Sequence, residues 1–382
     1  MSNLLIIHGG GPTAVLNASL HGVIQATYEV GSHKLWGAIG GTGGVLKQHF
    51  IDLSNLSQDQ IGGLLTTPGS VIGSSRDELS DADYAEILHV LRRRKISAVL
   101  VNGGNGSMDA AAKLWRICRS AGIRVMGIPK TMDNDIPITD HSPGYGSAAR
   151  YIASSVAELA VDVRGLPAHL VIVESLGRDT GWAAAAAALA ADSGFGPDRI
   201  YLPEIPFEES SFLRDCETLM KEKGHGVVVV SEGLKKPDGS PIVSPTFQRG
   251  RITYHGDVGA HLANLIIRDL GYRVRNERPG LLMRCGMAHV SAIDREEAIM
   301  AGQFACHQIL KGESGHMVAF RRLPGSRYQI EPFLLPLEKL AFGKKPVPRS
   351  FINETGNHVT ADFCEWSRPL IGAPLQRFIR LV

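Results

Sequence analysis

The sequence predicts an α/β protein in which mostly parallel, doubly wound sheets are covered by helices. Three observations lead to this prediction: five short aliphatic runs without period-two alternation, a glycine-rich or polar cluster directly after each run, and amphipathic segments between the runs. Runs without alternation are typical of strands that are buried on both faces. Strands that alternate with helical segments form βαβ units and therefore parallel sheets.

Each aliphatic run accounts for one expected strand and ends in a cluster of polar residues. The runs are 4–7, 97–101, 125–128, 170–173 and 227–230, and the clusters that follow them are 8–11, 102–107, 129–135, 174–178 and 231–233. Amphipathic helices are expected at 81–94 and 108–121. Because open α/β sheets bind ligands beyond the carboxyl ends of their strands, the five clusters are the candidate site segments.

Two α/β domains are expected, because about nine βα units exceed one comfortable sheet. A crossover between the domains is predicted near residues 136–146, which contain two prolines and two glycines. From about Pro324 onward the prolines cluster and no strand is evident, so an irregular C-terminal extension is expected there.

Charge and cysteine content exclude several classes of protein. The chain has 40 Lys+Arg against 38 Asp+Glu, so no global basic field exists to hold a nucleic acid or an anionic membrane. Five scattered cysteines without a CxxC argue against a disulfide framework and a structural zinc site. The N-terminus lacks a signal-peptide pattern, and the apolar stretch 182–191 is too short to span a bilayer. We therefore expect a cytoplasmic protein.

The cluster after the first run, Gly9 to Ala14, matches G-x-G-x-x-A, the first half of a dinucleotide-binding fingerprint. The second half is missing, because the next expected strand, 34–39, ends in glycines and not in an acidic residue. Pro12 also removes one backbone donor that a pyrophosphate group would need. These features favour a plain phosphate loop or a tight turn over a bound NAD.

The cluster 102–107 has the pattern of a strand end, a glycine turn and a helix start. Glycines let the backbone approach a ligand, and the free N–H groups of a helix N-terminus attract phosphate. Taken alone, Ser107 is equally well explained as a helix N-cap.

The cluster 130–135 places a lysine, a threonine and two aspartates after an expected buried strand. Carboxylates two residues apart in an extended segment point the same way, so Asp133 and Asp135 are expected to share a face. Such a pair suits Mg²⁺, or takes a proton from an attacking hydroxyl, and Lys130 suits a transferring phosphoryl group. The alternative is a solvated loop with a turn-forming Asp-Asn-Asp.

Charged residues also close the last two clusters. Arg178 follows Leu176-Gly177, and its planar guanidinium suits phosphoryl oxygens or a surface salt bridge. Glu232 suits sugar hydroxyls or a helix cap. A local basic patch, which suits a phosphate ester or a solvated face, is formed by Arg273, Arg275 and Arg278.

In their order and approximate spacing, these clusters resemble the phosphofructokinase family over about residues 3–320. The strongest match is Pro129-Lys130-Thr131-Met132-Asp133-Asn134-Asp135. The other matches are Gly10-Gly11, Gly103 to Ser107, Leu176-Gly177-Arg178 and Glu232. The pyrophosphate-dependent branch looks closest at Gly10 to Thr13, Asn102 to Asp109 and Leu282 to Cys285.

The resemblance implies a domain arrangement of phosphofructokinase type. Residues 1–137 with about 256–310 would bind the phosphoryl donor, and 138–255 with about 311–325 would bind the sugar phosphate. Residues 326–382 would form the C-terminal extension. In relatives the position of Arg275 reaches in from a neighbouring subunit, which implies a homodimer or homotetramer.

The activity implied is that of a Mg²⁺-dependent glycolytic kinase that phosphorylates the 1-hydroxyl of fructose 6-phosphate, giving fructose 1,6-bisphosphate. Its catalytic residues would be Lys130, Thr131, Asp133 as the base, and Arg178. The donor-binding residues would be Gly10, Gly11, Arg76, Gly104, Asn105, Gly106 and Ser107. The substrate-binding residues would be Lys130, Thr131, Asp133, Asp135, Leu176, Gly177, Arg178, Glu232, Arg275 and Arg284, and the metal ligands Asn105, Asp133 and Asp135.

The identity of the donor depends on two residues that point to different donors. Pyrophosphate users in this family typically carry an aspartate at the position of Gly106, where the carboxylate excludes a nucleotide, together with the lysine that matches Lys130. Some ATP-dependent relatives combine this glycine with this lysine. Because Gly106 leaves the space open, we expect ATP as the donor, with pyrophosphate as the alternative.

Three departures from the family pattern leave alternatives open. Asn105 stands where many relatives have a metal-associated aspartate, so Mg²⁺ would rely more on Asp133 and Asp135. His169 and Leu281 replace an arginine and a histidine that bind the sugar 6-phosphate in bacterial relatives. Sedoheptulose 7-phosphate, another sugar phosphate or a polyol therefore stay open as acceptors. A dinucleotide-dependent oxidoreductase and an inactive sugar-phosphate sensor are the remote alternatives.

Overall fold

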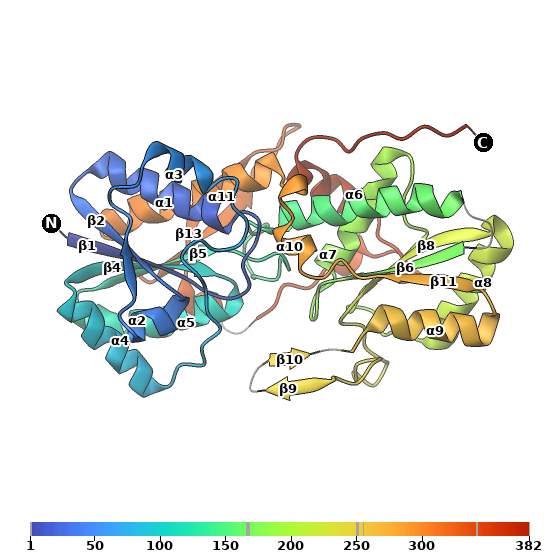
Figure 1. The fold of residues 1–382 in the computed structure, drawn as a ribbon, viewed down its shortest axis with the longest axis horizontal. Helices are drawn as coiled ribbons and strands as arrows, with labels where there is room; N and C mark the ends of the chain where they lie inside the picture. Colours follow the sequence, from blue (N-terminus) through green and yellow to red (C-terminus); the bar gives the residue numbers. More distant parts are fainter. Residues whose placement is uncertain (1, 166–168, 250–251, 255, 341–342, 382) are drawn as a thin grey trace. The chain divides into compact units, whose positions relative to one another are not determined.

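The computed structural model describes residues 2–165, 169–249, 252–254, 256–340 and 343–381. The chain divides into two compact units (Figure 1). Unit 1 is formed by Met1–Ser147 and Arg284–Lys345, and unit 2 by Ala148–Met283 and Pro346–Val382. Among the described residues, no helix combines the length and the apolar character that crossing a membrane requires.

Unit 1 contains a seven-stranded sheet of order β13-β12-β5-β4-β1-β2-β3. The strands are β1 (Ser2–His8), β2 (His33–Ala38), β3 (Phe50–Asp52), β4 (Ile96–Gly103), β5 (Arg124–Pro129), β12 (His316–Arg322) and β13 (Ile330–Pro336). The five central strands are parallel, and only the two edge strands, β3 and β13, pair antiparallel with their neighbours. This is the mostly parallel sheet that the aliphatic runs predict.

Helices cover both faces of this sheet. On one face lie α1 (Leu16–Val30), α3 (Gln58–Gly63) and α11 (Ala292–Leu310), and on the other α2 (Gly41–Leu46), α4 (Asp81–Arg93) and α5 (Asn105–Cys118) (Figure 1). Consecutive residues of β1 divide between the two cores: Leu4 and Ile6 pack with α1, whereas Leu5 and Ile7 pack with α4 and α5. The strand is therefore buried on both faces, which explains its uninterrupted aliphatic sequence.

Unit 2 contains a fully parallel sheet of order β11-β6-β8-β7. Its strands are β6 (His169–Ser175), β7 (Arg199–Tyr201), β8 (His225–Ser231) and β11 (Arg273–Glu277). The helices α8 (Glu209–Lys223) and α9 (Val258–Leu270) pack against one face through Phe212, Leu219 and Leu262. The remaining elements of the two units, among the residues that the structure describes, are α6 (Tyr145–Arg164), α7 (Trp182–Ala185), α10 (Leu282–Cys285), α12 (Ala361–Ser367), six 3₁₀ helices and the antiparallel pair β9 (Phe247–Arg249) and β10 (Ile252–Tyr254).

The limits of the units differ from the expected domain limits. Residues 256–283 were expected with the donor-binding domain but belong to unit 2, because β11 pairs with β6 and α9 packs beside them. Residues 311–325 were expected with the sugar-phosphate domain but belong to unit 1, because β12 pairs with β5. The roles assigned to the two domains stay predictions.

The C-terminal region is also more ordered than expected. Residues 330–336 form β13, although Pro332 and Pro336 suggested an irregular segment. A proline lacks the N–H that a central strand must donate, and edge strands tolerate it. Since β13 is the outermost strand of its sheet, both prolines are accommodated.

Candidate active site

The first glycine cluster lies between two other segments at the carboxyl end of the unit 1 sheet. The N–H of Gly9 donates to the carbonyl of Asn102 at 2.8 Å, and the N–H of Gly10 donates to the carbonyl of Ser75 at 2.8 Å. The segment therefore runs alongside residues 74–76 and does not turn straight into α1. This arrangement brings Arg76 next to the glycines.

Three cationic side chains gather at Gly10 and Gly11. Lys130 donates through Nζ to the Gly11 carbonyl at 2.6 Å. A Cβ placed on Gly11 would lie 2.7 Å from Nη1 of Arg284 and 3.0 Å from Nη2 of Arg76. The resemblance assigned Arg284 to the distal phosphate of the substrate, and here it stands beside the residues expected to bind the donor.

The mutual repulsion of these cations is visible in their pKa values. Burial is the main cause that lowers the pKa of Lys130 to about 8; Arg284 and Arg76 lower it further, and Asp133 and Asp135 oppose them. Burial and Arg76 also lower the pKa of Arg284. A bound polyanion would relieve this repulsion, so the cluster suits a ligand with several negative charges.

The second glycine cluster forms the start of α5. Gly104 is the N-cap residue, so the N-cap interpretation of Ser107 is wrong. The Ser107 side chain instead packs against the glycine backbones: a Cβ on Gly103 would lie 2.1 Å from its Oγ. At Gly106 a Cβ would meet no atom within 4 Å, so the space beside this residue is open.

The aspartate loop that follows β5 is bent and not extended. Asn134 has a φ of 51°, and the chain bends at Met132 and Asp133. The expectation of an extended segment is therefore wrong, because the left-handed Asn134 breaks the period-two alternation, and the turn-forming alternative is the one observed. A shared face for Asp133 and Asp135 no longer follows from alternation. Both aspartates are partly buried.

Hydrogen bonds tie this loop to itself and to α5. Thr131 accepts at Oγ1 from the Asp133 N–H at 3.1 Å and donates to Oδ1 of Asp135 at 3.4 Å. Asn105 donates through Nδ2 to the Asp135 carbonyl at 3.1 Å. The glycine turn and the aspartate loop are thus directly linked.

The donor set of this loop fits a magnesium ion. Mg²⁺ takes oxygen ligands and is usually held by one or two carboxylates together with substrate phosphates. Asp133 and Asp135 supply carboxylates, whereas Asn105 has only its Oδ1 left as a ligand, because its Nδ2 is engaged. No group of three or more His, Cys, Asp or Glu with metal-binding geometry occurs among the described residues.

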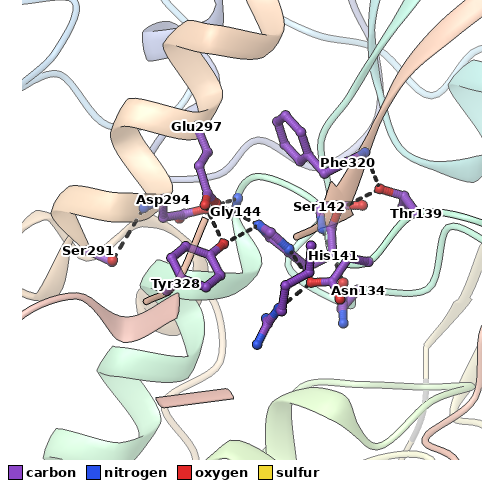
Figure 2. Close-up of polar contacts among 12 residues, drawn as sticks. Asn134, Thr139, His141, Ser142, Gly144, Ser291, Asp294, Glu297, Phe320 and Tyr328 are labelled. Atoms are coloured by element: carbon purple, nitrogen blue, oxygen red, sulfur yellow. Dashed lines mark hydrogen bonds and ion pairs between the residues drawn. The ribbon is translucent and has the colours of Figure 1, made fainter. Parts of the chain in front are cut away.

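A buried charge cluster holds the segment that follows the aspartate loop (Figure 2). His141 contacts Oδ2 of Asp140 at 2.8 Å through Nδ1, and Oε2 of Glu297 at 2.6 Å through Nε2. Tyr328 donates to the other oxygen of Glu297. Although burial lowers the pKa of His141, the two carboxylates outweigh it and raise the pKa to about 9. The imidazole is therefore charged at neutral pH.

A second cluster of predicted residues lies in unit 2, at the ends of β6 and β8. Glu232 accepts at Oε1 from the Gly177 N–H at 3.4 Å, and the same atom lies 4.0 Å from Nε of Arg178. Arg178 is 40% exposed at its side chain, so the guanidinium reaches solvent. Leu176 lies next to these groups in the chain.

Arg278 belongs to this second cluster, whereas the sequence grouped it only with Arg273 and Arg275 in a basic patch. Its guanidinium lies 3.0 Å from Glu174, 3.8 Å from Glu232 and 4.0 Å from Asp257. Burial raises the pKa of Glu174 to about 7, against the opposing effects of the Gly259 N–H and Arg278. The basic patch of three arginines is therefore divided.

The other two members of that patch, Arg273 and Arg275, are exposed on the edge strand β11. No contact in the described part of the chain places Arg275 with Glu232. The spacing of the three arginines is consistent with this division. Arg273 and Arg275 are two residues apart within β11 and share its exposed side, whereas Arg278 follows the end of the strand.

A lysine and two arginines beside a glycine-rich backbone, with two aspartates next to them, are the chemical groups of a phosphotransferase. A family model described as Phosphofructokinase matches residues 3–309. The chain belongs to the phosphofructokinase family and is a phosphotransferase of that family.

Relatives match along nearly the whole chain. A pyrophosphate–fructose 6-phosphate 1-phosphotransferase of Xanthomonas campestris pv. campestris (strain B100) is 35% identical over 97% of this chain and 91% of its own. A sulfofructose kinase of Alkalicoccus urumqiensis is 32% identical, covering 96% and 94%. The crystal structure of a pyrophosphate-dependent phosphofructokinase from Marinobacter aquaeolei superposes with a TM-score of 0.88 at 32% identity, covering 99% and 95%.

Proposed function

We propose that this chain transfers a phosphoryl group from pyrophosphate to the 1-hydroxyl of fructose 6-phosphate. The observation that carries the proposal is the cluster of Lys130, Arg76 and Arg284 at the Gly10–Gly11 backbone. Phosphoryl transfer requires positioned cations and one base, with no covalent nucleophile. The cluster supplies the cations, and Asp133 beside it supplies the base.

In the proposed reaction, Asp133 accepts the proton of the sugar 1-hydroxyl as the hydroxyl oxygen forms its bond to phosphorus. The bond between phosphorus and the bridging oxygen breaks, and inorganic phosphate leaves. Lys130, Arg76 and Arg284 stabilise the charge on the transferred and leaving groups. Thr131 keeps the loop folded by accepting from the Asp133 N–H.

The magnesium ion would be held by Asp133 and Asp135, with Asn105 as a weaker candidate. When bound, it would neutralise phosphate oxygens that the side chains do not reach.

The choice of donor reverses the preference that Gly106 suggested. Two of the relatives reported above, the Xanthomonas and Marinobacter proteins, match over more than nine-tenths of both chains and are named for pyrophosphate. Neither name supports ATP as the donor. Three cations around a short stretch of backbone also match a compact polyanion in charge. The open space at Gly106 is compatible with a nucleotide, so ATP is the donor to test against pyrophosphate.

For the acceptor, we propose that the unit 2 cluster of Leu176, Gly177, Arg178 and Glu232 binds the sugar. Glu232 would accept hydrogen bonds from its hydroxyls. Arg275, exposed on an edge strand, would serve a neighbouring copy of the chain in a homodimer or homotetramer.

The experiment that tests this proposal is an aldolase-coupled assay with Mg²⁺ and fructose 6-phosphate, run with pyrophosphate and with ATP. We expect turnover with pyrophosphate and at least tenfold less with ATP. Turnover with ATP alone would overturn the proposed donor. Turnover of sulfofructose in a direct product assay, without turnover of fructose 6-phosphate, would overturn the proposed acceptor and favour the activity for which the Alkalicoccus relative is named.

A further inference from the structure

Lys345 reaches the aspartate loop from more than 200 positions further along the chain. Its Nζ donates to the carbonyls of Asp140 at 2.8 Å and Thr139 at 3.0 Å, and to Oδ1 of Asn134 at 3.4 Å. An ammonium group has three N–H donors and no acceptor. Three oxygen acceptors therefore match its donors one for one.

The backbone of Lys345 makes a second contact with the same loop. Its N–H donates to the carbonyl of Asp135 at 2.9 Å. That carbonyl also accepts from Nδ2 of Asn105 at 3.1 Å, so it is held from α5 on one side and from Lys345 on the other. Asp135 thus has its backbone fixed by two donors that are remote from it in sequence.

The acceptors of Lys345 are themselves the turning points of the loop. Asn134 has the left-handed φ of 51°, and its Oδ1 also accepts from the Ser142 N–H at 3.1 Å. The Thr131 N–H donates to the Pro143 carbonyl at 3.1 Å, which closes the loop. Residues 131–143 therefore fold back on themselves, and the ammonium of Lys345 bonds to three oxygens within the fold.

The surroundings of Lys345 favour a charged ammonium at neutral pH. Burial lowers its pKa to about 8, while the Asp140 and Asp135 carboxylates oppose the shift. Hydrogen bonds from a charged donor are about twice as strong as those between neutral groups. Replacing the ammonium by an apolar group would leave three oxygen acceptors without this donor.

We propose that Lys345 is a positioning residue for phosphoryl transfer, which holds the Asp133–Asp135 turn in its reactive geometry without touching a substrate. The inference rests on the proposed function, since Asp133 is the proposed base. It also extends the site to a part of the chain beyond residue 309, where the match to the family model ends.

The test compares Lys345→Met with Lys339→Met, a lysine on the same C-terminal segment that is exposed to solvent. For Lys345→Met we expect a kcat lowered by about 10- to 100-fold, because small misplacements of reacting groups cost rates of this size. The KM values for both substrates should stay within about twofold. Lys339→Met should match the wild type. A kcat of Lys345→Met equal to that of the wild type would overturn the proposal.

Chemical rescue separates positioning from a general packing defect. Lys345→Cys alkylated with 2-bromoethylamine restores an ammonium at nearly the same length and should regain most of the kcat, whereas alkylation with iodoacetamide should not. The wild type is treated in parallel, because Cys285 and Cys364 are partly exposed. A failure of the aminoethylated protein to exceed the iodoacetamide-treated one in kcat would overturn the proposal.

If Lys345→Met does not fold, Lys345→Arg keeps the charge but not the three-donor geometry, and the same selective loss of kcat is expected.

Hydrogen exchange distinguishes a failure of this inference from a failure of the proposed function. Amides of residues 131–143 should exchange faster in Lys345→Met than in the wild type and in Lys339→Met, whatever reaction the enzyme catalyses. Unchanged exchange there would overturn the role of Lys345 even in an active enzyme. If the wild type does not turn over fructose 6-phosphate but exchange does increase, the proposed function fails and the structural role of Lys345 stands.

Discussion

At the scale of single residues, the cations of unit 1 are held close together and partly out of water. Lys130 is 3% exposed, and its ammonium donates to the Gly11 carbonyl. Keeping a lysine charged in such a place depends on the aspartates that face it. The balance between burial and these carboxylates makes the charge of Lys130 sensitive to pH in the range where the enzyme would work.

The pH dependence of donor use follows from this balance. With its pKa lowered to about 8, Lys130 is protonated below pH 8 and loses its charge above it. We expect kcat/KM for pyrophosphate to fall as the pH rises through 8. In Lys130→Arg the guanidinium keeps its proton, so the fall should move to higher pH. Profiles of both proteins between pH 6 and 10 check this, and identical profiles would contradict it.

Replacing the proposed base should abolish most turnover and leave the fold intact. The Asp133→Asn side chain keeps the size of the carboxylate but cannot take a proton, and the backbone bond from residue 133 to Thr131 survives the change. General base catalysis typically contributes about 10²–10⁴-fold, so kcat should fall by that factor. The coupled assay measures the loss, and a melting temperature near that of the wild type shows that the fold persists. An active variant would rule out Asp133 as the base.

The open position at Gly106 allows a direct test of the donor. An aspartate there would meet no atom within 4 Å at its Cβ and would sit in the first turn of α5, where a negative charge is favoured. We expect Gly106→Asp to keep pyrophosphate-dependent turnover within about tenfold of the wild type. Any residual turnover with ATP should disappear, because the carboxylate repels a nucleotide phosphate. Loss of the pyrophosphate reaction with retention of the ATP reaction would contradict the proposed donor.

At the scale of elements, β4, β5 and the loops after them show what could be read from the sequence. The five aliphatic runs became strands, and the clusters at 9–11, 102–107 and 130–135 came together, because parallel strands end at one edge of a sheet. The turn at Asn134 was only the alternative to an extended segment, since the bond from the Ser142 N–H that holds Asn134 joins residues eight positions apart. The contacts of Lys345 could not be predicted from local sequence patterns, because they join residues about 200 positions apart.

The ion pair between α11 and the segment after the aspartate loop is expected to contribute strongly to stability. Glu297 accepts from Tyr328 and pairs with His141, and both partners of the pair are buried. Removing one partner of a buried pair costs about 3–5 kcal/mol, because the other is left without compensation. We expect Glu297→Ala to lower the free energy of unfolding by about 3 kcal/mol, as measured by urea denaturation at pH 7. A loss below about 1 kcal/mol would show that Asp140 alone satisfies His141.

The same variant should change how stability depends on pH. The folded-state pKa of His141 is raised from 6.5 to about 9, so its contribution is fully present below pH 6.5 and is lost as the pH rises through 9. In Glu297→Ala the pKa of His141 should be lower than in the wild type, so the stability lost as the pH rises should be smaller. Because Lys130 and Lys345 titrate in both proteins, the difference between wild type and Glu297→Ala is the quantity to follow. That difference should narrow between pH 7 and 10, and a constant difference would contradict the assignment.

At the scale of the whole molecule, each unit has its own sheet and core, and each receives a late segment of the chain. Unit 1 takes β12 and β13, and unit 2 takes residues 346–381. In unit 2 that last segment packs Phe351, Phe363 and Trp366 around Trp182. These aromatic residues of the last segment therefore pack into unit 2, although the composition of the segment gave no sign of this, whereas Ile379 and Leu381 are exposed.

Phe363 offers a test of whether the two units unfold separately. Its side chain is fully buried, and truncating such a phenylalanine costs about 3–5 kcal/mol through lost burial and the cavity left behind. We expect Phe363→Ala to accelerate hydrogen exchange in β6 and β8, since local opening follows the stability of the unit that contains the change. The amides of β1 and β4 in unit 1 should exchange at the wild-type rate, because the described residues of the two cores that contain these strands all precede the last segment. Equal acceleration in both units would mean that they unfold as one cooperative body. If the units unfold separately, Phe363→Ala should also keep the wild-type pH dependence of kcat/KM that is attributed to Lys130 and of the stability that is attributed to His141, since both residues lie in unit 1.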